Sequence, residues 1–102
     1  GGKLMDFIRE YGVSSLDYEY VMHNLKKDII DAIRLSEENV RENLTYFNGL
    51  GIYKDISKII LIRPDLLLMP NDNLVKIVGQ MDKELFVNII NKDTEDLILF
   101  GI

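Results

Sequence analysis

The sequence predicts an all-α domain on three grounds. Apolar residues recur every three or four positions along most of the 102 residues, which is the period of one face of a helix. Glycine, proline and serine separate these apolar runs at points that suit helix ends. Short runs such as Ile59–Ile62 and Leu66–Met69 are aliphatic enough for strands, but their apolar positions also follow the helical period. Helices are therefore preferred to strands throughout.

The first helix is expected over Lys3–Tyr11, which carries an apolar stripe at helical spacing. Gly12 is well placed to end it. Ser14 and Ser15 then offer hydroxyl groups that can accept hydrogen bonds from the unpaired amides of the next helix. A second helix should therefore begin directly after them.

Leu16–Leu35 is either one long helix or two, and the polar patch at residues 23–28 is where a break is expected. Ser36 suits the cap of the following helix, and the two glutamates after it place negative charge at the positive end of the helix dipole. We expect this helix to end at Asn48-Gly49.

A further helix is expected over Tyr53–Ile62. It cannot continue through Pro64, because proline pushes the residue before it out of the α region. Pro64 can instead open a one-turn helix, Asp65–Met69, since proline is favoured in a first turn. Pro70 should end that turn.

The C-terminal third is predicted to hold two more helices and a last turn. The apolar residues that mark the two helices are Leu74, Ile77, Val78 and Met81 for the first, and Leu85, Phe86, Ile89 and Ile90 for the second. Thr94 is expected to cap the last turn, Glu95–Phe100.

Comparison of the chain with itself indicates an internal repeat. At an offset of 34 residues, the distance from Asp31 to Asp65, residues 31–36 lie over residues 65–70. The same offset pairs apolar residues with apolar residues: Val40 with Leu74, Leu44 with Val78 and Phe47 with Met81. At an offset of 31 residues, the distance from Asp65 to Asp96, residues 65–69 match residues 96–100.

Three copies with a period in the low thirties are typical of stacked helical units, each of which covers its apolar face with its neighbours. We therefore predict one α-solenoid-like domain over residues 1–102, with units at 4–35, 36–69 and 70–100. The match is one of apolar class more than of identity, so the alternative is a chance similarity between amphipathic helices.

Residues 44–81 also hold an ordered set of motifs: Leu50-Gly51-Ile52, a helix, Pro64-Asp65-Leu66-Leu67, and a helix with Leu74 and Val78. This order resembles the repeat of the mitochondrial transcription termination factor (mTERF) family. The resemblance implies a short right-handed superhelix of triangular three-helix units, two to three in number here, whose groove binds nucleic acid in the better-known members. The flanks match less well, because Ile30 and Glu95 stand where the proline of the motif would fall.

The composition is that of a folded domain. Its apolar fraction of 47% suits a single core that buries roughly 60–70% of the unfolded chain's surface. No apolar run approaches the ~18 residues that cross a bilayer, so no membrane association is predicted. No secretory signal is visible and cysteine is missing, so we expect a cytoplasmic protein without disulfides. Gly1-Gly2 in place of methionine suggests a cloning remnant and a longer natural chain.

No residue pattern indicates catalysis, a cofactor or a metal site. Gly49-Leu50-Gly51 lacks the third glycine of a phosphate-binding loop, because Lys54 occupies that position. Asn71-Asp72-Asn73 lacks the glycine and the final glutamate of a calcium loop, and it suits a helix cap better. His23 is the single histidine, so a second imidazole for a metal or a proton relay is missing. We expect a non-enzymatic protein.

The leading functional prediction is a module that binds another protein. Tyr18 and Tyr20 are two residues apart, so one face of a helix cannot bury both. At least one should be exposed, where a tyrosine is a good contact residue for a partner. Together with Lys54 and Lys58, which are four residues apart, these tyrosines form the predicted partner-binding region.

The alternative is a nucleic-acid-binding module of the mTERF type. Its phosphate contacts would come from a basic stripe: Lys54, Lys58, Arg63, Lys76 and Lys83. The simpler interpretation of these residues is a solvated face screened by nearby aspartates, and the net charge of −5 weighs against phosphate binding. Because a short array leaves apolar ends, self-association is also expected.

Overall fold

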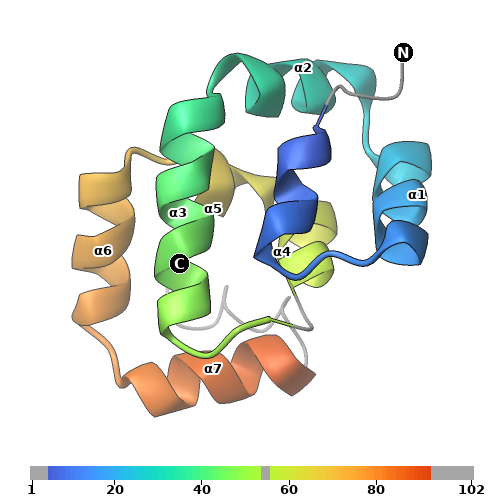
Figure 1. Cartoon of the computed structure of the whole chain (residues 1–102). Helices are drawn as coiled ribbons and strands as arrows, with labels where there is room; N and C mark the ends of the chain where they lie inside the picture. Colours follow the sequence, from blue (N-terminus) through green and yellow to red (C-terminus); the bar gives the residue numbers. More distant parts are fainter. Residues whose placement is uncertain (1–4, 54–55, 93–102) are drawn as a thin grey trace.

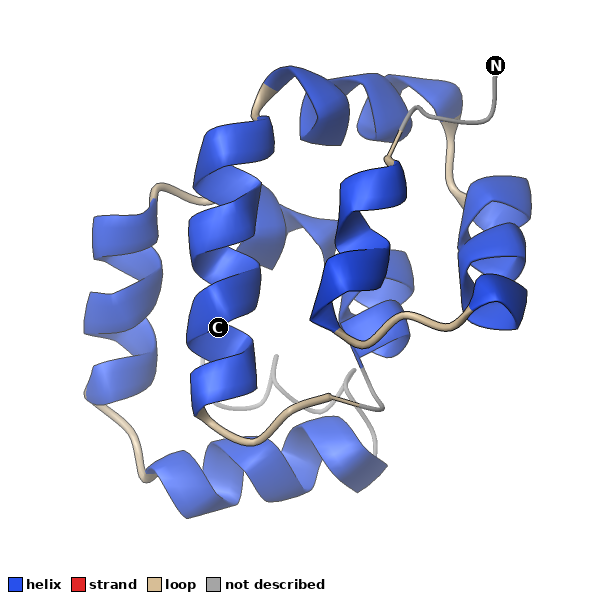
Figure 2. Ribbon diagram, viewed as in Figure 1, coloured by secondary structure: helices blue, strands red, loops and turns tan. Residues whose placement is uncertain are grey.

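The computed structural model describes residues 5–53 and 56–92, and every regular element within them is a helix (Figure 2). The prediction of an all-α fold is thereby confirmed. In chain order the elements are the 3₁₀ helix η1 (Asp6–Tyr11) and the helices α1 (Ser15–Asn24), α2 (Lys27–Leu35), α3 (Glu37–Gly49), α4 (Ile56–Ile62), α5 (Pro64–Leu68), α6 (Asn71–Gly79) and α7 (Lys83–Lys92). Lys54 and the predicted turn at 95–100 lie outside the described residues.

The N-terminal helix boundaries follow the local signals in the sequence. The hydroxyl of Ser14 accepts a hydrogen bond from the amide of Asp17 at 3.1 Å, which caps α1. Leu25 has an extended backbone, so α1 and α2 are separate helices with the break inside the predicted patch. Ser36 stands at the N-cap position of α3, but its side chain makes no capping hydrogen bond there. The capping role predicted for the Ser36 side chain is therefore wrong.

Proline and aspartate set the boundaries of the later helices. Pro64 is the first residue of α5, and Pro70 directly precedes α6, as the backbone restrictions of proline predict. Before α7, one carboxylate oxygen of Asp82 accepts hydrogen bonds from the amides of Glu84 and Leu85, at 2.9 and 3.3 Å. The starts of α5, α6 and α7 are thus each fixed by a proline or by a capping aspartate.

The helices pack with a regular correspondence along the chain. α1 packs against α4, α2 against α5, and α3 against α6, so each of these three helices meets the one three places later, and α3 also packs against α5. η1 packs against α1 and α3, and in Figure 1 α3 stands between η1 and α6 while α7 passes across their lower ends. α3 therefore occupies the centre of the arrangement.

Two glycines stand at equivalent points, just before α1 and just before α4. Gly12 and Gly51 have positive φ values, 103° and 89°, a conformation that side chains disfavour. Each is followed by a buried aliphatic residue, Val13 or Ile52. A Cβ on Gly12 would lie 2.9 Å from the carbonyl oxygen of Tyr53, so the two loops also touch. The 34-residue offset does not align these glycines, because 39 residues separate them.

The core repeats the same pairing of positions. Val40 and Leu44 of α3 and their counterparts Leu74 and Val78 of α6 are all fully buried. Phe47 is also fully buried and stacks on Phe86 of α7, with ring centroids 6.2 Å apart. Since burying a side chain of this size contributes roughly 1.5–3 kcal/mol, these residues dominate the packing around α3.

The molecule does not extend into a long superhelix. Its radius of gyration is 12.8 Å, which matches the ~13 Å expected of a compact domain of this length. Its principal extents are 40 × 25 × 22 Å.

Candidate interaction surface

The two predicted contact tyrosines of α1 have opposite environments. Tyr18 is 7% exposed and belongs to the core, whereas Tyr20 is 61% exposed. The expectation that one of the pair is exposed is confirmed, but Tyr18 is wrong as a contact residue for a partner. It shares its helix face with Val21 and Leu25, which also pack in the core.

Among the described residues, none makes a hydrogen bond of ordinary geometry with the buried hydroxyl of Tyr18, although Asp6 and the backbone of Met5 are close enough to influence its pKa. Burial, and secondarily the carboxylate of Asp6, raises the pKa of this phenol above its ordinary value. The group is therefore held neutral and packed as an aromatic core residue.

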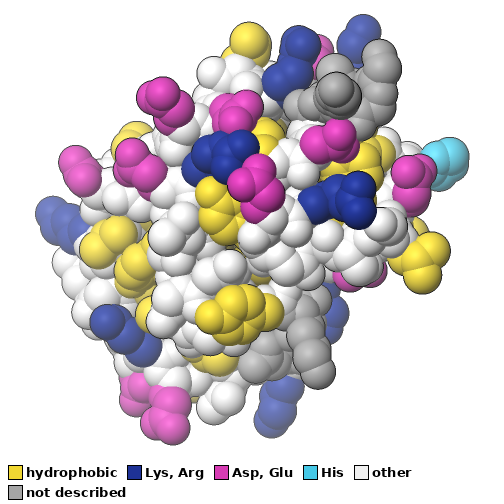
Figure 3. All heavy atoms as spheres, viewed as in Figure 1, with side chains coloured by type: hydrophobic (Ala, Val, Ile, Leu, Met, Phe, Trp, Pro, Cys, Tyr) yellow, Lys and Arg dark blue, Asp and Glu magenta, His cyan; other side chains and the backbone are white. Residues whose placement is uncertain are grey.

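The described members of the predicted basic stripe are spread over several elements. Lys58, Lys76 and Lys83 are exposed on α4, α6 and α7 respectively. Arg63 donates from Nε and Nη2 to the carboxylate of Asp65, at 3.0 and 2.9 Å, and this pairing lowers the pKa of Asp65. On the face drawn in Figure 3, the Lys and Arg side chains are separated by acidic and uncharged ones. A continuous basic stripe is not evident on that face.

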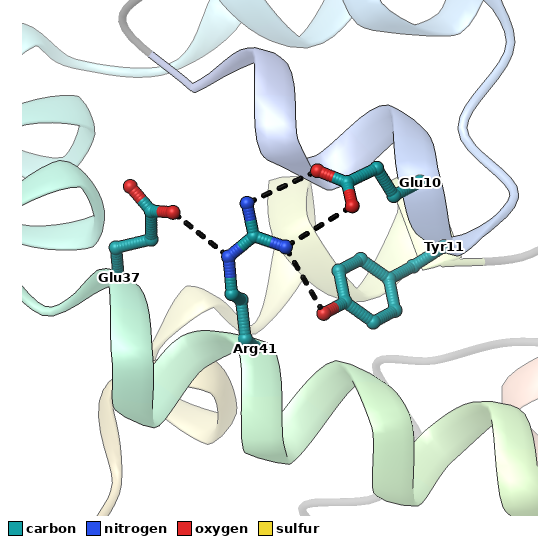
Figure 4. Close-up of polar contacts among 4 residues, drawn as sticks. All are labelled: Glu10, Tyr11, Glu37 and Arg41. Atoms are coloured by element: carbon teal, nitrogen blue, oxygen red, sulfur yellow. Dashed lines mark hydrogen bonds and ion pairs between the residues drawn. The ribbon is translucent and has the colours of Figure 1, made fainter.

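Arg41 of α3 is the centre of a polar cluster that reaches η1 (Figure 4). Its guanidinium donates to Glu37 at 2.8 Å, to both carboxylate oxygens of Glu10 at 3.2 and 3.0 Å, and to the hydroxyl of Tyr11 at 3.5 Å. It also lies 5.1 Å from the centre of the Phe7 ring. Hydrogen bonding to Arg41 lowers the pKa of Glu10. With two carboxylates around one cation, the cluster is a clamp between η1 and α3 and not an anion site.

Asparagine side chains connect α3 to the elements that follow it. Asn43 is fully buried, and its Nδ2 donates to the carbonyl oxygens of Leu66, Leu67 and Met69 at 3.4, 2.7 and 2.8 Å. Its Oδ1 accepts from Nδ2 of Asn71 at 3.0 Å. These bonds satisfy the free carbonyls at the end of α5, which would otherwise be costly to bury.

The hydrogen bonds of Asn43 are named here the buried seam, and two further asparagines of α3 extend it. Asn39 donates to the carbonyl of Met69 at 2.8 Å and accepts from the amide of Asn71 at 3.1 Å, so it caps α6 from a distance. Asn48 donates to the carbonyls of Tyr11 and Ile52, at 3.2 and 2.9 Å, and so joins the two glycine loops. Sequence reasoning missed these roles. The signal available in the sequence was that Asn39, Asn43 and Asn48 lie on a helix that also carries a strong apolar stripe.

Leu16 and Tyr20 form the outer face of α1, the apolar surface named here the α1 face. Leu16 is 83% exposed, and it precedes Tyr20 by one helical turn. Glu19 and His23 are exposed on the same helix. Leu16 and Tyr20 are four residues apart and share one side of α1, whereas Tyr18 is buried on the other side. Of the predicted partner-binding region, Tyr20 on the α1 face and Lys58 on α4 are exposed, and Leu16 is an exposed neighbour that the prediction did not include.

No protein-family model, curated protein or solved structure matches this chain. Within the described ranges, no helix is both long enough and apolar enough to span a membrane. The same ranges hold no group of three or more metal-ligating side chains placed to hold an ion.

Proposed function

We propose that this chain is a non-enzymatic helical-repeat module that binds another protein through the α1 face. The observation that carries the proposal is the exposed pair Leu16 and Tyr20, two large side chains one turn apart. Aromatic residues beside aliphatic ones are typical of the centre of protein interfaces. Burying both side chains against a partner would remove much of the exposed apolar surface of α1 from water.

The repeat part of the proposal rests on the correspondence between successive helices. The contacts of α1 with α4, α2 with α5 and α3 with α6 are those expected of two stacked three-helix units. The equivalent glycines Gly12 and Gly51 support the same interpretation. Together with Pro64 at the start of α5, they favour the triangular unit that the mTERF resemblance implies.

Nucleic-acid binding of the mTERF type is the second candidate, and the same three-helix correspondence favours it. Lys58, Lys76 and Lys83 would be its described phosphate contacts. Against it stand the net charge of −5 and the pairing of Arg41 and Arg63 with carboxylates. Protein binding is therefore ranked first.

Site-specific photo-crosslinking tests the first candidate. A photoreactive phenylalanine analogue placed at Tyr20 should form a discrete protein adduct in an extract of the source cells. The adduct should disappear when Leu16→Glu is added, and the same analogue placed at the exposed Lys92 of α7 should not form it. Adducts that form equally from both positions would argue against the α1 face.

A titration against labelled DNA and RNA at low salt tests the second candidate. Under that hypothesis, binding should weaken steeply as salt rises and should be lost in a Lys58→Glu/Lys76→Glu variant. Sedimentation of the same samples tests the expected self-association. A dimer that is lost in Leu16→Glu would identify the partner of the α1 face as a second copy of the chain.

A further inference from the structure

Two adjoining hollows run along the exposed side of α3, and together they are named here the α3 groove. The first, of about 480 Å³, is lined by Leu35, Ser36, Glu37, Glu38, Asn39 and Glu42. The second, of about 380 Å³, lies between α3 and α6 and is lined by Arg41, Glu42, Thr45, Tyr46, Asn71 and Val75. Glu42 lines both hollows, so the two shallow hollows adjoin at this residue of α3.

The α3 groove has apolar ends and an acidic middle. Leu35 is 80% exposed at one end, and Val75, 40% exposed, lies beside the half-buried Tyr46 at the other. Between these ends stand Glu38 and Glu42, which are exposed and one turn apart. In Figure 3, acidic side chains gather over the start of α3 and α6, and hydrophobic ones lie just below them.

The acidic middle of the groove is not neutralised by the protein itself. Glu37 is paired with Arg41, but the contacts of the described residues leave Glu38 and Glu42 without an ion pair. Asp72, at the start of α6 next to Asn71, adds a further exposed carboxylate. The groove therefore presents unpaired negative charge beside apolar surface.

We infer that the α3 groove binds a basic amphipathic helical segment of a partner protein. Lys or Arg side chains of that segment would lie beside Glu38 and Glu42, and its apolar side chains would cover Leu35 at one end and Tyr46 with Val75 at the other. The stretch from Glu38 to Tyr46 rises about 12 Å along α3, and Leu35 lies just before it, so a partner helix of about four turns is long enough to reach both apolar ends. This is the helix-in-groove mode of peptide recognition, with charge fixing the orientation.

Charge distinguishes this partner from the other occupants considered. A second copy of a chain with a net charge of −5 would bring like charges together, and nucleic-acid phosphates would do the same. The α3 groove and the α1 face lie on different helices, so this inference goes beyond the proposed function and can fail independently of it.

Fluorescence anisotropy with the full chain tests the inference. The probe is a labelled amphipathic helix about four turns long, made of leucine and lysine, and its companion has glutamate in place of lysine. The lysine peptide should bind and the glutamate peptide should not. Glu42→Lys should weaken binding by about tenfold, as expected for reversing one charge at the interface. Val75→Ser should weaken it by about fivefold through lost apolar contact.

The matched control is Glu19→Lys, which makes the same change of charge at an exposed position of α1. It should change the affinity by less than about twofold. Equal losses from Glu42→Lys and Glu19→Lys would mean that only net charge is sensed and would overturn the inference. So would equal binding of the glutamate peptide, or loss of binding in Leu16→Glu with Glu42→Lys unaffected. Circular dichroism of each variant confirms that it is folded.

Discussion

On one side of α3, the charged guanidinium of Arg41 holds η1 through Glu10, at the surface. On the other side, the neutral carboxamide of Asn43 holds the end of α5, fully buried. Both side chains make several hydrogen bonds from one helix, but in different environments. A charge is tolerated where water still solvates it, whereas a buried position needs a neutral group whose hydrogen bonds are all satisfied. The comparison predicts that the two contacts respond differently to substitution, salt and pH.

Replacing the buried amide with a carboxylate should have the largest effect. In Asn43→Asp the Nδ2 donor is lost, and a carboxylate oxygen faces the carbonyls of Leu66, Leu67 and Met69. We expect a loss of about 3–5 kcal/mol in the free energy of unfolding, because the group is either a buried charge or a poorly paired acid. Urea denaturation followed by circular dichroism measures it.

Asn73→Asp is the matched control for that substitution. Asn73 is exposed in the first turn of α6, where a negative charge is compatible with the helix dipole. Its stability should change little or rise slightly. If both variants lost the same stability, the buried seam would not be the cause.

Removing the surface clamp should have a smaller effect that depends on salt. Arg41→Met keeps the apolar stem over Phe7 but removes the hydrogen bonds to Glu10 and Glu37. Because salt screens exposed ion pairs, the loss in free energy of unfolding caused by Arg41→Met should be smaller at high than at low NaCl concentration. The loss in free energy of unfolding in Asn43→Asp, compared with Asn73→Asp, should be the same at both salt concentrations. A clamp deficit that grew with salt would contradict the ionic interpretation.

Acid should weaken the clamp before it affects the buried seam. The pKa of Glu10 is lowered in the folded state by Arg41, so its contribution is present above the unfolded pKa and is lost as pH falls through the folded pKa. The same sign applies to Asp65 beside Arg63. Urea unfolding midpoints, measured at successively lower pH from pH 6, should therefore decrease once the pH is below about 4.3, the ordinary pKa of a glutamate. Glu10→Gln should flatten part of that fall, and an unchanged slope would exclude Glu10 as a source of it.

The helices could be predicted from the sequence because their signals are local. Ser14 and Pro64 act within a few residues of themselves, and the 3.6-residue period marks the buried face of each helix. The clamp and the seam could not be predicted in the same way. Arg41 meets Glu10 across 31 residues and Asn43 meets Leu67 across 24, so their pairing depends on how the units stack.

The predictions about surface residues show the same difference between local and long-range information. Spacing alone indicates that Tyr18 and Tyr20 lie on different faces, but it did not identify Tyr18 as the buried one. Tyr18 lies three residues before Val21 and seven before Leu25, and this helical spacing indicates that it belongs to the same buried face. The predicted basic stripe depended on the relative placement of separate helices, which no local pattern contains.

The smallest expected effect concerns Tyr18, whose buried hydroxyl makes no hydrogen bond of ordinary geometry among the described residues. Tyr18→Phe removes that hydroxyl and keeps the ring, so stability at neutral pH should be unchanged or higher by up to about 1 kcal/mol. The pKa of the phenol is raised by burial, so its contribution is present below the unfolded pKa of about 10 and is lost as pH rises through the folded pKa. Tyr18→Phe should therefore unfold less readily than the parent chain in alkaline solution. Tyr20→Phe, at an exposed position of the same helix, should show neither effect. A clear loss of stability in Tyr18→Phe at neutral pH would mean that the hydroxyl has a partner after all.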